Sequence, residues 1–418
     1  MSLFSGAMGL DLGLECAGFR TRVVLEINKA ALETIKTNRP RLPRVEESIQ
    51  DTSTKELLEK AGLTRDQVTV VAGGPCCQSF STAGKRGSLS DPRGNLFREF
   101  CRVVRDTQPR FFVMENVKGI LSAAVKHRPL NKRGPGHPHL QPEERLGSAL
   151  KEILKELRAL NYYVVFGLLN AADYGVPQKR WRVVFIGSRD GEDISIPVPT
   201  HRDPSVKPPK GDSRLPWKTL REAIEDVDAE NWSDFSESRI PLLRLLKAGQ
   251  NWRDLPAKLH KEALGAAFES WGGRSGFCRR LSWDEPAPTL TSVPDGRATT
   301  LCHPTKIRPL STEEYAALQQ FPEGWGFVGS VAQQYLQIGN AVPIGLSRAI
   351  GLSIRSTMRQ TGRQGLPQGA RERKGTVVCQ GDLQKRIDER RETILHPSRL
   401  RKIKTVEAAK KWIQASTA

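Results

Sequence analysis

Short apolar runs that alternate with amphipathic helical segments constrain the fold of this chain more than any other feature. Strand-like runs occur at residues 21–26, 68–72, 111–115, 163–168 and 182–187, and helical patterns at residues 10–17, 95–107 and 146–160. Alternation of this kind predicts strands that lie parallel in one sheet, with helices on both faces. The sequence therefore predicts an α/β protein built on a doubly wound, mostly parallel sheet.

The alternation is lost after residue 188, where the chain becomes rich in proline and charge, and order returns near residue 305. We expect residues 1–188 and 305–360 to form the sheet domain, and residues 189–304 a smaller, irregular domain. Residues 361–418 are strongly basic and are predicted to be an extension, for which a solvated tail or surface helix is favoured over a dedicated contact surface.

The net charge of the chain indicates which class of partner to expect. The 418 residues contain 65 Lys and Arg against 46 Asp and Glu, a formal charge of +19. This excess favours a polyanionic partner such as nucleic acid, although a merely soluble basic protein has the same composition. An uncharged apolar run of the roughly 20 residues that a membrane span needs is lacking, so no membrane partner is expected. Seven cysteines without zinc spacing and the lack of a secretory signal predict a reduced, cytoplasmic protein without a metal site.

Glycines and an acid follow the first two predicted strands. Gly6, Gly9 and Gly13 lie in FSGAMGLDLG, where small residues let a ligand approach the backbone at the carboxyl edge of a sheet. The spacing differs from G-x-G-x-x-G, so a dinucleotide site is weakly supported and a tight turn explains the stretch equally well. Glu26 ends the next strand, where a carboxylate can accept both hydroxyls of a ribose or simply be solvated.

Two adjacent thiols, Cys76 and Cys77, follow the strand at 68–72 in GGPCCQSFS. A thiolate at a strand end is a strong nucleophile if nearby charge or backbone N–H groups lower its pKa, whereas a lone cysteine is more often a small buried hydrophobe. One strand further on, Glu115 ends an apolar run. Desolvation there is expected to raise the pKa of its carboxyl group, so that it stays protonated and acts as a general acid.

Two arginines, Arg180 and Arg182, stand two residues apart in QKRWR at the start of the last predicted strand, and therefore on one face. Their forked guanidinium groups are suited to holding a carbonyl oxygen or a phosphate. The alternative is ordinary surface charge.

With these stretches in one order, the chain resembles the cytosine-C5 DNA methyltransferases from residue 3 to about residue 352. FSGAMGLDLG resembles the cofactor loop of the family, GGPCCQSFS its nucleophile loop and ENV its acid motif. QKRWR, RRLSWDEPAPTL and QIGNAVP resemble three later motifs in the expected order. The resemblance implies a Rossmann-like fold that uses S-adenosylmethionine, with residues 189–304 as the target-recognition domain.

The resemblance also implies individual roles. Cys77 is expected to be the nucleophile that adds to carbon 6 of a flipped-out cytosine, Glu115 the acid at ring N3 and Arg182 the group that holds O2. Cys76 stands where the family usually has proline. The residues that match cofactor positions are Phe4, Gly6, Gly9, Glu26, Ile49, Leu96 and Asn340. Those that match DNA-contacting positions are Gln78, Ser81 and Arg180.

The expected activity is methylation of double-stranded DNA by a monomer, in a restriction-modification system whose endonuclease acts separately. Three departures from the family pattern accompany it: Met8 replaces a frequent glycine, Ser48 replaces a frequent aspartate, and three residues precede Phe4. The alternatives are a tRNA methyltransferase, which the long domain at 189–304 disfavours, a non-catalytic DNA-binding protein, and a nicotinamide oxidoreductase, which lacks the glycine fingerprint.

Overall fold

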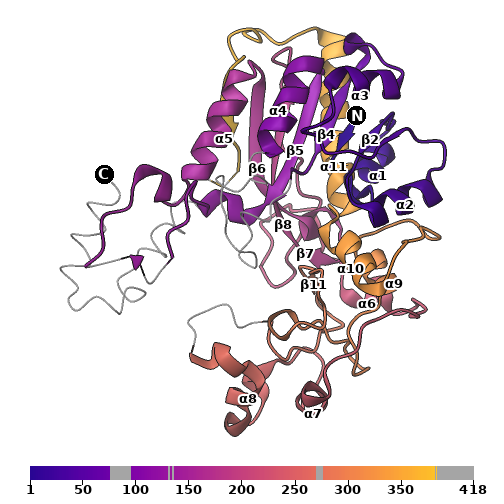
Figure 1. The fold of residues 1–418 in the computed structure, drawn as a ribbon, viewed down its shortest axis with the longest axis vertical. Helices are drawn as coiled ribbons and strands as arrows, with labels where there is room; N and C mark the ends of the chain where they lie inside the picture. The colour runs from indigo at the N-terminus through magenta and orange to yellow at the C-terminus, as the bar shows by residue number, and fades with distance from the viewer. Residues whose placement is uncertain (76–95, 130–131, 134–135, 270–275, 382, 384–418) are drawn as a thin grey trace.

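The computed structural model describes residues 1–75, 96–129, 132–133, 136–269, 276–381 and 383. Figure 1 shows a larger upper part, in which helices pack against a sheet, and a smaller lower part built from short helices and loops. The predicted α/β class with a mostly parallel sheet is confirmed. Among the described helices none combines the length and the apolar character needed to cross a membrane.

Eight strands of the described residues form the main sheet, in the order β12-β6-β8-β5-β4-β1-β2-β3. Within it β8 runs antiparallel to both neighbours, β5 and β6, while the other pairs are parallel. Its strands are β1 (Ser2–Leu3), β2 (Val24–Leu25), β3 (Arg44–Val45), β4 (Val70–Gly73), β5 (Phe111–Val117), β6 (Tyr163–Asn170), β8 (Trp181–Ser188) and β12 (Val377–Cys379). Two small parallel pairs are β7 (Gln178–Lys179) with β11 (Ala287–Pro288), and β9 (His201–Arg202) with β10 (Leu215–Pro216).

The helices confirm the alternation seen in the sequence. Those that follow the early strands are α1 (Gly9–Cys16), α2 (Lys29–Asn38), α3 (Thr54–Ala61), α4 (Leu96–Thr107) and α5 (Ser148–Ala159). The lower part and its connection contain α6 (Leu220–Ile224), α7 (Ile240–Arg244), α8 (His260–Leu264), α9 (Thr312–Leu318) and α10 (Val331–Asn340), and the long α11 (Ile344–Gln364) returns to the sheet.

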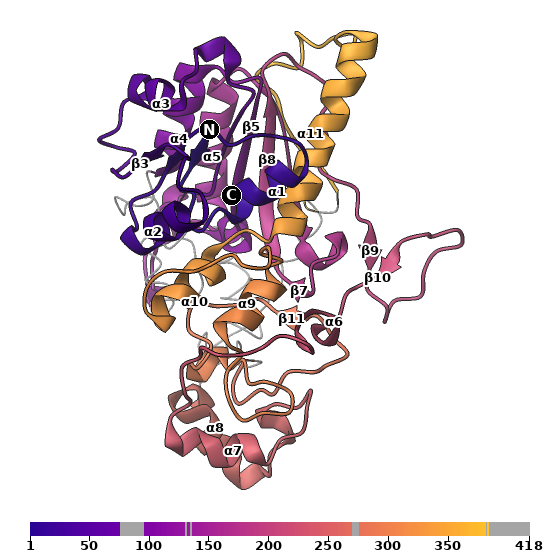
Figure 2. The same ribbon diagram turned by 90° about the vertical axis from the view of Figure 1, so that its right-hand side faces the viewer.

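Alternating side chains of the central strands build two cores. Phe112 and Met114 of β5 pack with α4 and α5 on one face, while Phe111 and Val113 pack with α1 and α11 on the other. Successive side chains of a strand point to opposite faces, so a strand that is apolar at every position must be covered on both. Figure 2 shows these two helix layers on either side of the sheet.

The lower part has its own small core, made by Phe235, Leu242, Leu243, Leu246, Leu255, Ala263, Cys278 and Cys302. It begins later than the boundary expected at residue 189. Ile194 belongs to the core beneath α11, and Leu220 and Ile224 pack in a third cluster together with α1, α9 and α10. Ile194, Leu220 and Ile224 are thus buried outside the small core, whereas Val198, Val206 and Leu215 are exposed, and the domain boundary at residue 189 stays a prediction.

The C-terminal extension departs from the expectation of a purely solvated tail. After α11 the chain turns back, and β12 pairs in parallel with Val164–Phe166 of β6. Leu383 is 2% exposed in the core of the α4–α5 face, and Arg373 forms an ion pair of 2.9 Å with Asp193. The expected solvated tail or surface helix was wrong for residues 377–379 and for Leu383, because the apolar triplet Val377–Cys379 satisfies the backbone groups of an otherwise open sheet edge. Residues 384–418 lie outside the described residues.

Candidate active site

Glu115 and Arg182 meet at the carboxyl edge of the sheet. Antiparallel pairing of β5 with β8 sets Val117 opposite Arg182, and Arg182 Nε lies 2.5 Å from Glu115 Oε1. Glu115 is 8% exposed and Arg182 likewise 8% exposed. We call this pair, with Gly74, Pro75 and Asn116 beside it, the acid–arginine edge. The two residues that the sequence assigned separately are thus brought into direct contact.

The start of the nucleophile loop lies against this pair. Asn116 donates from Nδ2 to the carbonyl oxygen of Pro75 at 3.3 Å, and accepts at Oδ1 from the backbone N–H of Val117. A Cβ atom on Gly74 would lie 3.0 Å from Glu115 Oε2. Glycine at this position therefore lets the chain leave β4 directly past the carboxyl group. The chain is described as far as Pro75, so Cys76, Cys77, Gln78 and Ser81 lie outside the described residues.

Burial raises the pKa of Glu115, as expected from the sequence. Desolvation is the main cause, and the nearby guanidinium groups of Arg182 and Arg180 oppose it without cancelling it. A neutral carboxyl group can donate one hydrogen bond through its O–H and accept through its other oxygen. The acid–arginine edge therefore offers a proton donor, an acceptor and a cationic donor side by side.

A strained turn after β1 faces the next strand. Phe4, Gly6 and Met8 have φ angles of 57°, 52° and 70°, in the region that favours glycine. Gly6 donates its N–H to Glu26 Oε2 at 2.7 Å, and a Cβ at Gly6 would meet no atom within 4 Å. The turn therefore presents open space beside a fixed carboxylate, which is a suitable surface for a ligand.

Glu26 is held in place by backbone donors. Its Oε1 atom accepts from the N–H groups of Ile27 at 2.9 Å and Asn28 at 2.8 Å, directly before α2. Asn28 caps that helix by accepting from the N–H of Ala31. Two carboxylate oxygens have about four acceptor positions, and three backbone donors occupy three of them here. Glu26 therefore retains acceptor capacity for a hydroxyl group.

The other expected cofactor residues occupy different environments. Phe4, Ile49 and Leu96 belong to one apolar cluster, with Ile49 only 2% exposed. Gly9 begins α1, where a Cβ would lie 2.5 Å from the carbonyl oxygen of Val342. Asn340 is exposed at the end of α10. The assignment of these positions to the cofactor stays a prediction.

Ile27 is a candidate that the sequence reasoning missed. Its side chain is 65% exposed although it directly follows Glu26. An exposed apolar side chain next to a polar anchor provides a flat contact for an aromatic or heterocyclic ligand. The signal available in the sequence was an isoleucine just after the predicted strand-end acid.

Arg180, which the resemblance assigned to DNA contact, is buried in the structure and bonded to backbone carbonyl groups, and its role at DNA stays a prediction. It is 1% exposed and donates from Nη1 to the carbonyl oxygen of Leu290 at 3.0 Å and from Nη2 to that of Gly339 at 2.6 Å. Gly339 lies in the last turn of α10, whose terminal carbonyl groups lack partners within the helix. The guanidinium group therefore caps α10 and joins β7 to the lower part of the molecule.

Two glutamines complete this arrangement, which we call the arginine junction: Gln178, Arg180 and Gln319. Gln178 is fully buried, donates from Nε2 to Gln319 Oε1 at 3.1 Å and accepts from the N–H of Leu290. Gln319 in turn donates to the carbonyl oxygens of Ile338 and Ala341. The sequence distance between these partners explains why sequence reasoning did not find the network.

A buried ion pair follows nearby in the chain. Arg308 binds Glu314 through both guanidinium arms, at 2.8 and 2.7 Å, and Glu314 also accepts from the N–H of Ser311. His303 Nε2 lies 3.6 Å from Glu314 Oε1, and its other ring nitrogen accepts from the N–H groups of Thr305 and Lys306. Burial lowers the pKa of His303 to about 4, against the attraction of Glu314.

The chain was compared with known proteins. Residues 1–356 match the family described as C-5 cytosine-specific DNA methylase. The chain is 36% identical to the Type II methyltransferase M.Sau96I of Staphylococcus aureus over 84% of its own length and 74% of that protein. It is 35% identical to the Type II methyltransferase M.Eco47II of Escherichia coli over 85% and 78%, respectively.

Solved structures agree at the level of the fold. A DNA modification methyltransferase encoded within an E. coli prophage superposes with a TM-score of 0.57 at 22% identity, covering 86% of this chain and 98% of that one. A mutant of Spodoptera frugiperda DNMT2 superposes with a TM-score of 0.50 at 18% identity, covering 85% and 98%. The match over residues 1–356 and the 36% identity over 74% of a Type II methyltransferase show that this chain belongs to the C-5 cytosine-specific DNA methylases.

Proposed function

We propose that the protein methylates carbon 5 of a cytosine that has been flipped out of double-stranded DNA, using S-adenosylmethionine and a covalent bond from Cys77. The observation that carries the proposal is the contact of 2.5 Å between Arg182 and Glu115 at the carboxyl edge of the sheet. This pair lies next to Pro75, two residues before Cys77 in the sequence.

The acid–arginine edge matches the hydrogen-bonding edge of cytosine. That edge presents O2, N3 and the exocyclic amine in a row. Arg182 would donate to O2, the neutral carboxyl group of Glu115 would donate to N3, and the second oxygen of Glu115 would accept from the amine. A base inside a duplex cannot reach these groups, so the target must be extruded, which costs a few kcal/mol of stacking.

The covalent step follows from the poor reactivity of cytosine carbon 5. The Cys77 thiolate would add to carbon 6, and its electron pair would make carbon 5 nucleophilic while Glu115 supplies a proton at N3. S-adenosylmethionine supplies the electrophilic methyl group on a sulfonium when it is bound. Carbon 5 would take the methyl group as the sulfonium–methyl bond breaks to leave a neutral thioether, and the N3 proton would return to Glu115. Loss of the carbon 5 proton to solvent would then re-form the double bond between carbons 5 and 6 and expel the Cys77 thiolate.

The residues of the glycine turn are suited to the proposed cofactor. Gly6 leaves open space, and Glu26 retains acceptor capacity for ribose hydroxyl groups. Ile27 provides an exposed apolar contact for a heterocycle. These residues would bind and orient the cofactor without taking part in bond making.

The relatives support a place in a restriction-modification system, because M.Sau96I and M.Eco47II are named Type II methyltransferases. We propose that this protein likewise protects a specific duplex sequence from an endonuclease that acts separately, and that it works as a cytoplasmic monomer. Bisulfite sequencing of genomic DNA from cells that express the protein would identify the sequence.

A duplex with 5-fluorocytosine at the identified position tests the covalent step. Fluorine cannot leave as a cation, so the adduct should persist after methyl transfer and migrate slowly on a denaturing gel. Wild-type protein and the Cys76→Ser variant should form the adduct, and Cys77→Ser should not. An adduct formed by Cys77→Ser but lost in Cys76→Ser would reverse the assignment, and preferential methylation of tRNA would refute the DNA substrate.

A further inference from the structure

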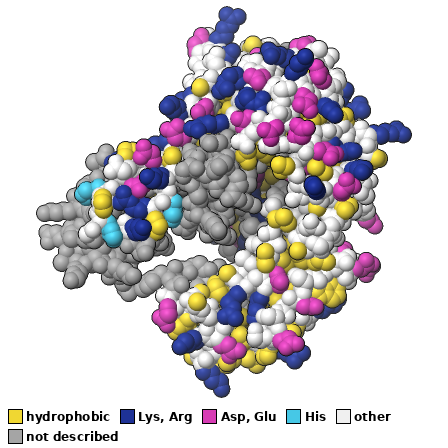
Figure 3. Space-filling view, in the orientation of Figure 1, with side chains coloured by type: hydrophobic (Ala, Val, Ile, Leu, Met, Phe, Trp, Pro, Cys, Tyr) yellow, Lys and Arg dark blue, Asp and Glu magenta, His cyan; other side chains and the backbone are white. Residues whose placement is uncertain are grey.

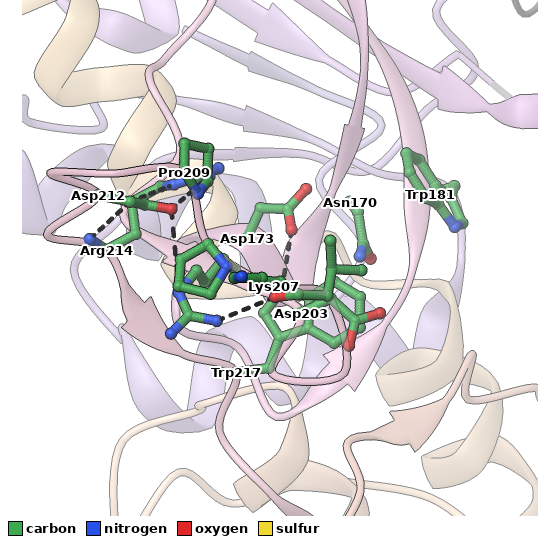
Figure 4. A pocket seen from close by; sticks show the side chains of 12 residues that line it. Asn170, Asp173, Trp181, Asp203, Lys207, Pro209, Asp212, Arg214 and Trp217 are labelled. Carbon is green, nitrogen blue, oxygen red and sulfur yellow. Dashed lines mark hydrogen bonds and ion pairs between the residues drawn. The ribbon is translucent and has the colours of Figure 1, made fainter.

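The segment between β9 and β10, residues 203–214, carries chemistry that the proposed catalytic steps do not use. Figure 4 shows that it faces a pocket formed with the end of β6 and the start of β8. Asn170 and Trp181 line the pocket from the sheet, while Lys207 and Arg214 line it from the segment. Trp181 directly precedes Arg182 on β8, so the pocket lies at the same end of the strand as the acid–arginine edge, although successive side chains of a strand point to opposite faces.

The base of the segment is fixed to the sheet. Asp173, in the short helix Ala171–Tyr174 that follows β6, accepts from the indole N–H of Trp217 at 2.8 Å. Its carbonyl oxygen accepts from the N–H of Thr200 at 2.9 Å, and Trp217 donates its own N–H to the carbonyl oxygen of Arg202. The segment therefore begins and ends on residues that are tied to the carboxyl end of β6.

Local turns order the segment itself. Asp203 accepts from the N–H and the hydroxyl of Ser205, and Asp212 accepts from the N–H and the guanidinium group of Arg214. Pro208 and Pro209 fix two consecutive φ angles between these turns. A segment that is already restrained loses less conformational entropy when it contacts a partner.

Two lysines dominate its outer surface. Residues 201–218 contain five Lys or Arg and two Asp, a local excess of three positive charges. Asp212 binds Arg214 at 2.8 Å and lies 3.9 Å from Arg202. Lys207 and Lys210 are exposed, and the described part of the chain places no carboxylate within ion-pair distance of either. Figure 3 shows Lys and Arg spread over both parts of the molecule, so charge alone does not single out a surface.

The position of the segment relative to Glu115 does distinguish it from the other basic surfaces. The register sets Glu115 level with Val184 of β8 and Gly167 of β6, so Asn170 at the end of β6 lies two strand spacings across and three residues along from Glu115, about 14 Å in all. At about 3.4 Å per base pair, this is the length of roughly four base pairs. Figure 2 shows the β9–β10 segment projecting at the level where the upper and lower parts meet. A duplex centred on the acid–arginine edge is therefore within reach of the segment.

We propose that residues 203–214 clamp the phosphate backbone of the DNA that flanks the target, through Lys207 and Lys210. The inference rests on the proposed placement of the target cytosine at Glu115. Lysine ammonium groups bind phosphates without reading sequence, so the clamp adds affinity and orientation but no base specificity. The paired Arg202 and Arg214 maintain the shape of the segment.

The double variant Lys207→Gln/Lys210→Gln tests this proposal on the full-length protein. Each lost phosphate contact should reduce the slope of log affinity against log salt by about 0.9, hence by about 1.8 in total. Between about 50 and 200 mM salt the affinity gap to the wild type should then narrow about 12-fold on a duplex with flanks of about one helical turn. KM for DNA should rise while kcat at saturating DNA stays unchanged.

The matched control is Lys55→Gln/Lys60→Gln on α3, which removes the same charge from a helix at the top of Figure 1. It should leave the salt slope unchanged, and a duplex trimmed to about two flanking base pairs should abolish the difference between the Lys207→Gln/Lys210→Gln variant and the wild type. An unaltered slope in that variant, an equal change in the control, or a difference that persists on the trimmed duplex would overturn the clamp. All variants should still be trapped by 5-fluorocytosine, so loss of trapping in the wild type would instead count against the proposed function.

Discussion

Arg180 and Arg182 stand two residues apart, yet they serve two different regions. At the acid–arginine edge Arg182 faces a carboxyl group whose pKa is raised, and both groups remain partly exposed. At the arginine junction Arg180 is 1% exposed and donates to carbonyl oxygens of the backbone. In the proposed function the first contact is exchanged for contacts with the substrate, whereas the second stays within the protein. Two arginines that stand close together in the sequence can therefore have different roles.

Replacement of the acid should have the largest effect. In Glu115→Gln the amide keeps the shape of the carboxyl group but cannot deliver a proton to N3, so kcat should fall about 10²- to 10⁴-fold. Affinity for DNA should change little, because the residue binds only the flipped base. Single-turnover methylation and a gel-shift assay measure the two quantities. A variant that retained more than about a tenth of wild-type kcat would remove Glu115 from the chemistry.

Paired substitutions of the two arginines should separate stability from activity. Arg180→Met leaves the buried carbonyl oxygens of Leu290 and Gly339 without their donors, which should lower the free energy of unfolding by about 2–4 kcal/mol. Arg182→Met leaves Glu115, which can take up a proton, so stability should fall less while kcat falls more. Urea unfolding and methylation rates provide the comparison, and equal losses of stability in both variants would erase the distinction between the two regions.

The smallest expected effect is a loss of stability at acid pH that depends on His303. The pKa of His303 is lowered from 6.5 to about 4, so the folded protein binds fewer protons than the unfolded chain between those values. The stabilisation from His303 is therefore present above pH 6.5 and is lost as the pH falls toward 4, by at most about 3 kcal/mol. The groups that face His303 are Glu314, Arg308, Lys306 and Arg280.

His303→Asn keeps an acceptor for the N–H groups of Thr305 and Lys306 but cannot titrate, so its free energy of unfolding should depend less on pH between about 4 and 6.5. The contribution of Glu115 to stability depends on pH in the opposite direction. Its pKa is raised in the folded state, so this contribution declines as the pH rises above 4.5. Parallel pH curves for His303→Asn and the wild type would contradict the assignment to His303.

The sequence predicted the sheet and the raised pKa of Glu115 because both depend on local patterns. Apolar runs such as Phe111–Met114 mark strands buried on both faces, and an acid at the end of such a run has a raised pKa wherever the partner strand lies. Arg180 could not be assigned in this way, since its acceptor on Gly339 is 159 residues away in the chain. The strand Val377–Cys379 could not be predicted either. Three apolar residues in a basic segment form a strand only because an open edge of the sheet lies beside them.

That last strand has a practical consequence for anyone shortening the protein. The family match ends at residue 356, inside α11, so a chain cut there would lose the strand that pairs with Val164–Phe166 and the buried side chain of Leu383. Such a truncation would expose β6 as an unpaired, aggregation-prone edge strand, although the proposed catalytic residues would all still be present. Its insolubility could then be mistaken for a defect of the enzyme.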